Sequence, residues 1–148
     1  GPEQVEKMRQ LCRMAHVITP NRTEAALLAG LPADTPAEEL LAALRAQLEV
    51  ENTIVTGVCR ENEIGYLARL GEREMSLQYP RVAQTLHGTG DVFAAALCGA
   101  LLSCGEAPAA LRQAAEFCNA CVEKTAQRQP AHWYGLAFED VLKERSGL

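Results

Sequence analysis

Two glycines and an aspartate close together have the residue types and spacing to bind and transfer a phosphate. The segment reads Gly88-Thr89-Gly90-Asp91 and runs directly into an apolar stretch with the composition of a helix. Glycine permits backbone conformations that other residues avoid, so successive amides can converge here on one anion at a helix N-terminus. Asp91 beside that anion has the chemistry of a general base that takes a proton from an attacking hydroxyl. The segment therefore predicts phosphoryl transfer.

The same residues allow two other interpretations. Asp and Gly are common in capping turns, so the segment can be a plain helix N-cap. The spacing also resembles a G-x-G-x-x-G/A dinucleotide fingerprint, which requires a buried strand running into the first glycine. Residues 78–87 are polar and interrupted by Pro80, so the dinucleotide interpretation fits poorly.

A second polar group follows an expected strand near the start of the sequence. Residues 16–19 have the pattern of a short buried strand that Pro20 stops, and Asn21 and Glu24 open a helix that ends near Gly30. An N-x-x-E at a helix start is a capping box. The carboxyl end of a strand is also where open α/β sheets bind ligands, and there the two side chains would face phosphates and hold a hydrated Mg²⁺. Both interpretations stay open.

The other expected elements alternate between helix and strand. A buried strand at 52–58 carries Thr56 and Gly57, which either present a hydroxyl and open backbone to a phosphate or simply end the strand. Residues 63–70 and 73–79 predict a hairpin around Gly71-Glu72. Helices are expected at 3–15, at 36–48 with Thr35 as its cap, at 91–103 buried against the sheet, at 107–127 and at 138–145. The loop 129–135 carries His132, Trp133 and Tyr134, an aromatic cluster that either edges a purine pocket or packs.

Composition sets the class of protein. A chain of 148 residues predicts one domain with a real core, and the formal net charge of −5 with fourteen scattered Lys and Arg argues against a nucleic-acid surface. The sequence shows no apolar run of about twenty residues and no signal peptide, so we expect no membrane span and a cytoplasmic location. Cys118 and Cys121 form a C-x-x-C, for which a redox pair or half a zinc site are the alternatives to the buried thiols that we expect.

Three motifs in this order carry a family resemblance: ITPNRTEAALLAG at 18–30, TIVTGV at 53–58 and HGTGDVFAAALCGAL at 87–101. Together they resemble the ribokinase-like superfamily of small-molecule kinases, and within it most closely the pyridoxal and pyridoxamine kinases. The resemblance covers nearly the whole chain. It implies a three-layer α/β/α fold, of which residues 1–148 form the C-terminal, nucleotide-binding half with a mostly parallel sheet plus a hairpin. Members of the superfamily are longer, so the N-terminal substrate and lid portion is absent from these residues.

The resemblance also implies a role for each matching residue. Asp91 becomes the base that activates the substrate hydroxyl, the amides of Gly88 to Gly90 form the anion hole for the γ-phosphate, and Thr89 lies along the phosphates. Asn21 and Glu24 become the N-x-x-E motif that positions Mg²⁺, directly or through water. Thr19 and Thr56 match positions near a monovalent cation such as K⁺ and the ATP phosphates. Gly57 replaces a serine that is often found after that threonine, so a side-chain contact is not expected there.

The activity that the resemblance implies is transfer of the γ-phosphate of ATP to the 5′-hydroxymethyl group of pyridoxal, pyridoxine or pyridoxamine, as in vitamin B6 salvage. A hydroxymethylpyrimidine kinase, a sugar kinase of the same superfamily, or a non-catalytic nucleotide-binding or assembly module are the alternatives. The strand at 17–19 would normally lie inside a parallel sheet, so without its neighbours it exposes an apolar edge. We therefore expect the chain to self-associate or to require the missing N-terminal half.

Overall fold

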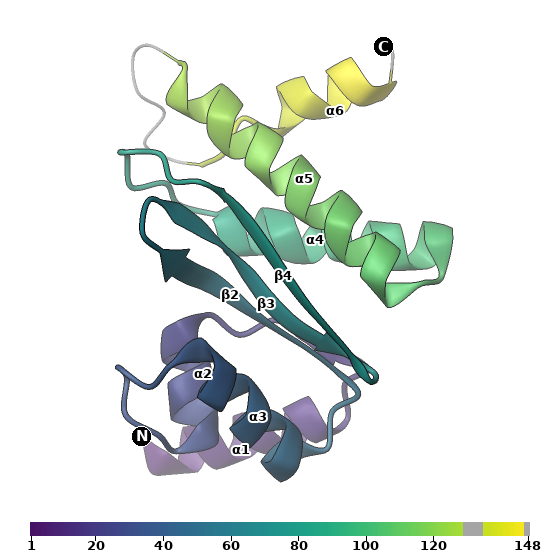
Figure 1. The fold of residues 1–148 in the computed structure, drawn as a ribbon. Coiled ribbons are helices and arrows are strands. Elements are labelled where there is room, and N and C mark those ends of the chain that lie inside the picture. The colour runs from purple at the N-terminus through teal and green to yellow at the C-terminus, as the bar shows by residue number, and fades with distance from the viewer. Residues whose placement is uncertain (129–134, 147–148) are drawn as a thin grey trace. The chain divides into compact units, whose positions relative to one another are not determined.

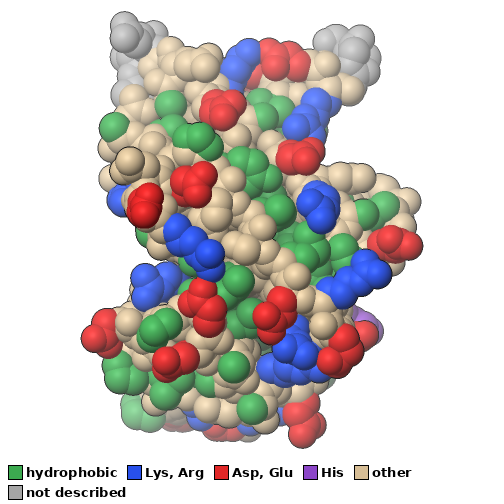
Figure 2. All heavy atoms as spheres, in the orientation of Figure 1, with side chains coloured by type: hydrophobic (Ala, Val, Ile, Leu, Met, Phe, Trp, Pro, Cys, Tyr) green, Lys and Arg blue, Asp and Glu red, His purple; other side chains and the backbone are tan. Residues whose placement is uncertain are grey.

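The computed structural model describes residues 1–128 and 135–146 (Figure 1). It divides into two compact units, Gly1–Gln78 and Tyr79–Leu148, and each is described by itself below. The aromatic cluster of His132, Trp133 and Tyr134 lies outside the described residues. Among the residues described, none of the helices combines the length and the apolarity that crossing a membrane requires. On the face drawn in Figure 2, acidic and basic side chains are interspersed over the described residues.

The sheet of the first unit is mixed. Its strands are β1 (Val17–Ile18), β2 (Asn52–Arg60), β3 (Glu63–Leu70) and β4 (Arg73–Pro80), in the spatial order β1-β2-β3-β4. β1 pairs parallel to β2, with Ile18 opposite Thr53, and β2 pairs antiparallel to β3. The expected hairpin is confirmed, because Gly71 and Glu72 join β3 to β4.

A bulge interrupts β2 where the sequence suggested that the strand ends. The register with β3 shifts between Thr56 and Val58, and Gly57 between them has a φ of +70°, a left-handed conformation that favours glycine. Val55 and Val58 both belong to the hydrophobic core of this unit, although side chains three residues apart in a regular strand point to opposite faces. The extra residue restores Val58 to the core side and allows the strand to continue to Arg60.

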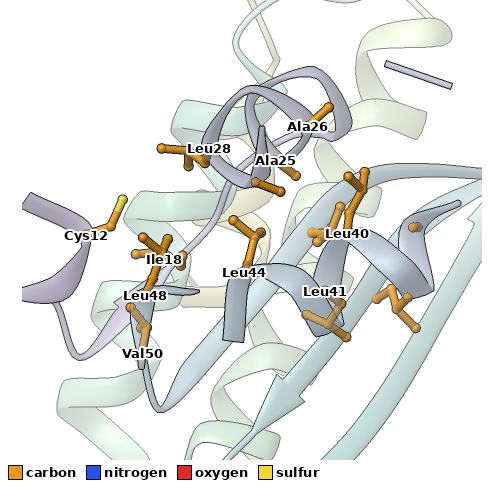
Figure 3. Packing of buried hydrophobic residues seen from close by; sticks show 14 of the residues in the cluster. Cys12, Ile18, Ala25, Ala26, Leu28, Leu40, Leu41, Leu44, Leu48 and Val50 are labelled. Carbon is orange, nitrogen blue, oxygen red and sulfur yellow. The ribbon is translucent and has the colours of Figure 1, made fainter. Parts of the chain in front are cut away.

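Three helices cover one face of this sheet: α1 (Pro2–Arg13), α2 (Arg22–Ala29) and α3 (Ala37–Leu48). The apolar stripe of α3 supplies much of the core, since Leu40 and Leu44 are fully buried (Figure 3). Burying one such leucine contributes about 1.5–3 kcal/mol. The predicted start of α3 is wrong by one position: Pro36 is the N-cap, and the buried Thr35 uses its carbonyl to accept a hydrogen bond from Arg22 Nη2 at 3.1 Å.

The second unit contains α4 (Thr89–Cys104), α5 (Ala107–Ala126) and α6 (Phe138–Ser146). α5 contacts both α4 and α6. Lys124 of α5 pairs with Glu144 of α6, and Arg128, just after α5, pairs with Asp140 of α6. The apolar composition of α4 does not translate into burial on every side of the helix within this unit. Its buried side chains lie on one face, at Phe93, Leu97 and Ala100, whereas Leu102 is 90% exposed.

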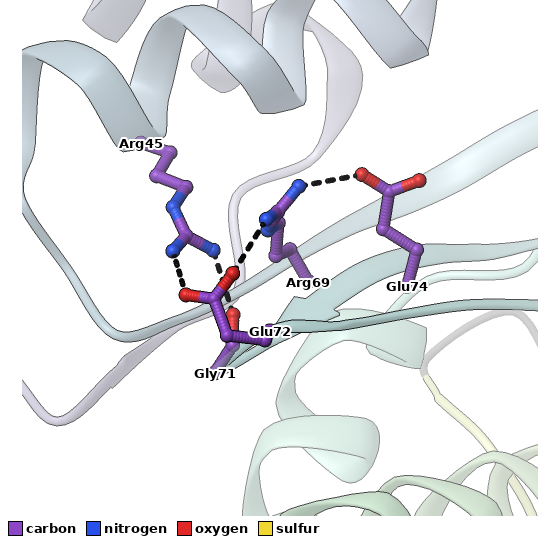
Figure 4. A network of polar contacts seen from close by, with 5 residues as sticks. All are labelled: Arg45, Arg69, Gly71, Glu72 and Glu74. Carbon is purple, nitrogen blue, oxygen red and sulfur yellow. Dashed lines mark hydrogen bonds and ion pairs between the residues drawn. The ribbon is translucent and has the colours of Figure 1, made fainter.

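An ionic network joins α3 to the hairpin turn (Figure 4). Arg45 donates from Nη1 to the carbonyl of Gly71 at 2.6 Å and from Nη2 to Glu72 Oε1 at 2.5 Å. Arg69 donates to Glu72 Oε2 at 3.1 Å and to Glu74 Oε1 at 2.8 Å. The hydrogen bond and charge of Arg45, with a smaller contribution from Arg69, hold the pKa of Glu72 below its usual range. The network therefore fixes the turn against α3 most firmly when Glu72 is ionised.

We predict that Glu72→Gln lowers the thermal stability of the chain at pH 7 by a small amount, because Glu72 is well exposed to solvent. A carboxyl group with a lowered folded-state pKa stabilises above its unfolded pKa, about 4.3, and loses that contribution as the pH falls through the folded value. The difference in melting temperature between the variant and the wild type should therefore shrink as the pH falls below about 4.3. Glu63→Gln, outside the network, is the control, and a Glu72→Gln difference that grows as the pH falls below this value would contradict the prediction.

Candidate functional site

The first unit brings the segment after β1 beside the bulge of β2. The amide of Thr56 donates to the carbonyl of Pro20 at 2.9 Å, and Asn21 and Thr56 form an isolated parallel bridge. The half-buried Thr19 immediately precedes this bridge, and the open glycine of the bulge, Gly57, follows it. The sequence suggested five residues of this unit for cation and phosphate contacts. Four of them, Thr19, Asn21, Thr56 and Gly57, lie on these two adjacent segments, and Glu24 lies in the first turn of α2.

Asn21 and Glu24 form the capping box at the start of α2. Asn21 Oδ1 accepts a hydrogen bond from the amide of Glu24 at 2.9 Å, and Glu24 Oε2 accepts one from the amide of Asn21 at 2.9 Å. At the other end, Gly30 adopts a left-handed conformation and terminates the helix. The capping interpretation is therefore confirmed, and it fixes both side chains at the solvent-exposed end of the strand.

The donor set in this unit fits a hydrated Mg²⁺ better than a directly bound one. In the part of the chain that the structure describes, no group of three or more His, Cys, Asp or Glu side chains is arranged to hold a metal ion. Glu24 uses Oε2 in the cap, which leaves Oε1 at the surface to accept a hydrogen bond from a water. Mg²⁺ keeps several waters and commonly takes its other ligands from substrate phosphates, so a single exposed carboxylate is sufficient for a water-mediated contact.

The second unit presents the glycine turn at the start of α4. Gly88 is the N-cap with a φ of +84°, and no side chain caps this end of the helix. The first amides of a helix have no partner within it, so the N–H groups of Thr89, Gly90 and Asp91 are available to an anion. A Cβ atom at Gly88 or Gly90 would meet no other atom within 4 Å, which shows open space beside this backbone. The exposed Asp91 lies in the first helical turn.

A contact that the sequence did not indicate holds this turn in place. The buried Cys118 of α5 donates its thiol to the carbonyl of Thr89 at 3.5 Å. Cys121 lies one turn further along α5. Burial raises the pKa of its thiol to about 11, with a smaller contribution from the neighbouring Cys118. The expectation that the C-x-x-C consists of buried thiols is therefore confirmed. Cys59 and Cys98, in contrast, are exposed.

The first unit also has a hollow of about 490 Å³ that no pattern in the sequence predicted. It lies between α3 and the β3–β4 hairpin, with Leu41 and Leu67 among its apolar lining and Arg45 and Arg69 at its polar part. Both guanidinium groups already donate to carboxylates of the network in Figure 4. The hollow contains none of the residues that the sequence suggested, and its paired charges do not favour an anionic ligand.

The fold and the motifs together define a class. The chain has the features of a ribokinase-like α/β fold: the end of β1 beside the bulge of β2, a capped N-x-x-E helix, and a glycine turn before a long helix. The predicted fold class is therefore confirmed. The sequence matches the family described as phosphomethylpyrimidine kinase over residues 1–135, and the chain belongs to this family.

Solved structures of the same fold are named as phosphomethylpyrimidine or pyridoxal kinases. A candidate phosphomethylpyrimidine kinase from Bacteroides thetaiotaomicron is 30% identical, with a TM-score of 0.88 over 99% of this chain and 53% of that one, and another crystal form of it contains pyridoxal. Pyridoxal kinase from Lactobacillus plantarum is 31% identical, with a TM-score of 0.81 over 99% of this chain and 56% of that one. The ADP complex of Bacillus subtilis pyridoxal kinase is 26% identical, with a TM-score of 0.76 over 91% and 52% of the two chains.

The chain spans about half the length of each of these solved structures. None of the curated proteins compared with it matches the sequence.

We predict two classes of thiol reactivity. The exposed Cys59 and Cys98 should react quickly with a thiol reagent at pH 8, whereas Cys12, Cys118 and Cys121 should react only after unfolding. With a pKa of about 11, only about 0.1% of Cys121 is ionised at that pH, and burial further limits access. Reaction kinetics followed by mass-spectrometric mapping of the labelled peptides measure this. Fast labelling of Cys118 and Cys121 in the folded chain would instead support a redox pair.

Proposed function

We propose that the chain is the C-terminal, nucleotide-binding portion of an ATP-dependent kinase that phosphorylates a hydroxymethyl group on a flat nitrogen heterocycle. The observation that carries the proposal is the uncapped glycine turn at the start of α4 with Asp91 in its first turn. Amides that hold a developing negative charge beside a carboxylate base are the minimal equipment for phosphoryl transfer. Membership of the phosphomethylpyrimidine kinase family, and the ADP bound to the B. subtilis relative, support it.

In the proposed reaction, the acceptor hydroxyl attacks the γ-phosphorus of ATP and ADP leaves. The amides of Thr89 and Gly90 bind the oxygens of the transferring phosphoryl group, and the Asp91 carboxylate takes the proton that the hydroxyl releases. Gly88 supplies the left-handed backbone that turns these amides towards one point. The thiol of Cys118 holds the carbonyl of Thr89 and so limits movement of the turn.

The residues of the first unit are proposed to act on cations and on the remaining phosphates. Mg²⁺, when bound, neutralises charge on the ATP phosphates. Glu24 and Asn21 would hold it through water, with the capping box fixing their positions. Thr19 and Thr56 are proposed to lie near a monovalent cation such as K⁺, and the open backbone of Gly57 admits a phosphate where a side chain would be strained.

We propose pyridoxal, pyridoxine or pyridoxamine as the acceptor, phosphorylated on the 5′-hydroxymethyl group in vitamin B6 salvage. The B. thetaiotaomicron relative that was crystallised with pyridoxal, and two relatives named as pyridoxal kinases, support this choice. A hydroxymethylpyrimidine is the second candidate, which the name of the matching family favours. Both acceptors present a primary hydroxyl beside a heteroaromatic ring. We propose that the acceptor pocket and the lid are formed by a portion of the kinase outside these residues. The proposed location of the kinase is the cytoplasm.

The first test is nucleotide binding by the chain itself. Gly90→Ala adds a methyl group where the structure has open space and where φ is not positive, so the variant should fold normally. If phosphates approach this backbone, the methyl group obstructs them, and we expect the affinity for Mg·ATP to fall at least about tenfold, or 1.4 kcal/mol. Isothermal titration calorimetry measures the affinity.

Gly99→Ala is the matched control for that test. Gly99 lies in the middle of α4, also with open space around it, and alanine there should raise helix stability by about 0.5–1 kcal/mol without changing ATP binding. Equal affinities of the wild type and Gly90→Ala would show that the turn does not hold the nucleotide.

The second test separates catalysis from binding. Asp91→Asn keeps the shape of the side chain and removes the base, so kcat should fall by about 10²-fold or more while the affinity for Mg·ATP is unchanged or slightly higher. Transfer to pyridoxal and to hydroxymethylpyrimidine is measured with the chain combined with the part of the B. thetaiotaomicron relative that the match leaves out. Glu106→Gln, at the start of α5, is the control. Turnover that Asp91→Asn leaves unchanged would favour a non-catalytic nucleotide-binding module.

A further inference from the structure

The hollow between α3 and the β3–β4 hairpin has an apolar base. Leu41 and Leu67, which line it, are both buried in the hydrophobic core of the first unit. Ala42 and Ala46 line it from α3, one turn apart and exposed, and their short side chains leave the space over this base unfilled. The volume of about 490 Å³ lies within the range of about 300–1,000 Å³ that small-molecule sites occupy. The hollow therefore has the size and the base of a small-molecule site.

The two arginines of the hollow are already held by carboxylates of the hairpin. Arg45 donates to Glu72 Oε1, and Arg69 donates to Glu72 Oε2 and to Glu74 Oε1 (Figure 4). A bound anion would have to displace one of these carboxylates and would be repelled by the others. The hollow therefore disfavours an anionic ligand.

The carboxylates of the hollow leave one negative charge without a partner. Glu38 pairs with Arg60 at 2.7 Å, and Glu74 pairs with Arg69 at 2.8 Å. Glu49, which also lines the hollow, forms no ion pair with any residue that the structure describes. Within those residues, no three acidic, His or Cys side chains are grouped to hold a metal ion. The unpaired charge beside an apolar base thus favours an organic cation over a bare metal ion.

The end of α3 adds to this preference. Glu49 is the C-cap of the helix, with a φ of +55°, and its amide donates to the carbonyl of Arg45 at 3.1 Å. The last carbonyls of a helix have no partner within it and form the negative end of the helix dipole. Helices that end in this left-handed conformation usually have glycine there, so the chain carries a carboxylate where glycine would be less strained. A cation beside Glu49 meets both the carboxylate and the helix end.

We propose that the hollow binds a small organic cation, with its ammonium group at Glu49 and its apolar body on Leu41 and Leu67. The ammonium group pairs with the free carboxylate, and the body fills the space beside Ala42 and Ala46. The hollow contains none of the residues of the proposed nucleotide site, so this second site does not depend on the proposed function.

Three probes with the same apolar body and different charges test the proposal: phenylbutylamine, phenylbutanol and phenylbutyrate. Each is titrated into the 148-residue chain without nucleotide, and the backbone amide shifts are followed by two-dimensional NMR. We expect phenylbutylamine to produce saturable shifts at the lining residues of α3 and β3, with a Kd below about 1 mM. The alcohol should bind at least about tenfold more weakly, and the carboxylate should produce no saturable shift there.

Variants of α3 separate the charge from the space. Glu49→Gln keeps the size of the side chain and removes its charge, so it should weaken the binding of phenylbutylamine at least about tenfold and leave phenylbutanol unchanged. Glu39→Gln is the matched control, because Glu39 is an exposed carboxylate of the same helix that does not line the hollow. Ala46→Leu fills the hollow from an exposed helical position, so the variant should fold and bind neither probe.

The proposal is overturned if phenylbutylamine produces no saturable shift at the lining residues, or if it binds no more tightly than phenylbutanol. An affinity for the amine that Glu49→Gln leaves unchanged, or tighter binding of phenylbutyrate than of the amine, would also contradict it. Failure of the kinase proposal is distinguishable, because these titrations contain no nucleotide and Asp91→Asn should bind phenylbutylamine as the wild type does.

Discussion

The parallel pairing of β1 with β2 is the interaction on which the candidate site of the first unit depends. It aligns the end of β1 with the bulge of β2, and the hydrogen bond from the Thr56 amide to the Pro20 carbonyl continues the pairing past the end of β1. Because parallel strands end at the same edge of a sheet, Asn21 and Thr56 meet although 34 positions separate them in sequence. The core beneath this edge, with Ile18, Leu44 and Val55, holds the two strands in register.

Backbone conformation supplies most of the chemistry proposed for this chain. Gly57 and Gly88 both have positive φ. Gly57 lies in the bulge of β2 and Gly88 is the N-cap of α4, and both features leave backbone groups without a regular partner. A side chain at either position would be strained, and it would also occupy space that is open in the structure. Gly57 stands where the superfamily that the chain resembles often has a serine. The bulge gives a conformational reason for the glycine, since the residue there has a left-handed backbone.

Local signals predicted most of the helices and strands and the capping box, whereas long-range packing was not predictable. The capping box of Asn21 and Glu24 depends on four consecutive residues, so the sequence specifies it fully. The burial of each α4 side chain depends on what packs against it, and the apolar composition alone does not distinguish the buried Leu97 from the exposed Leu102. The contact from Cys118 to Thr89 joins residues 29 positions apart, and no pattern in the sequence links them. Arg45 and Glu72 are likewise joined only by the packing of α3 on the hairpin.

The division between chemistry and specificity follows from the same geometry. Binding phosphates requires amides and a few polar side chains at strand and helix ends, all of which lie within short segments of these 148 residues. Recognising the ring of an acceptor requires a pocket with walls on several sides, which a sheet with an unpaired edge at β1 does not complete. In the proposed function, the base and the anion-binding turn therefore lie within short segments of these residues, whereas the pocket that selects the acceptor is proposed to lie outside them.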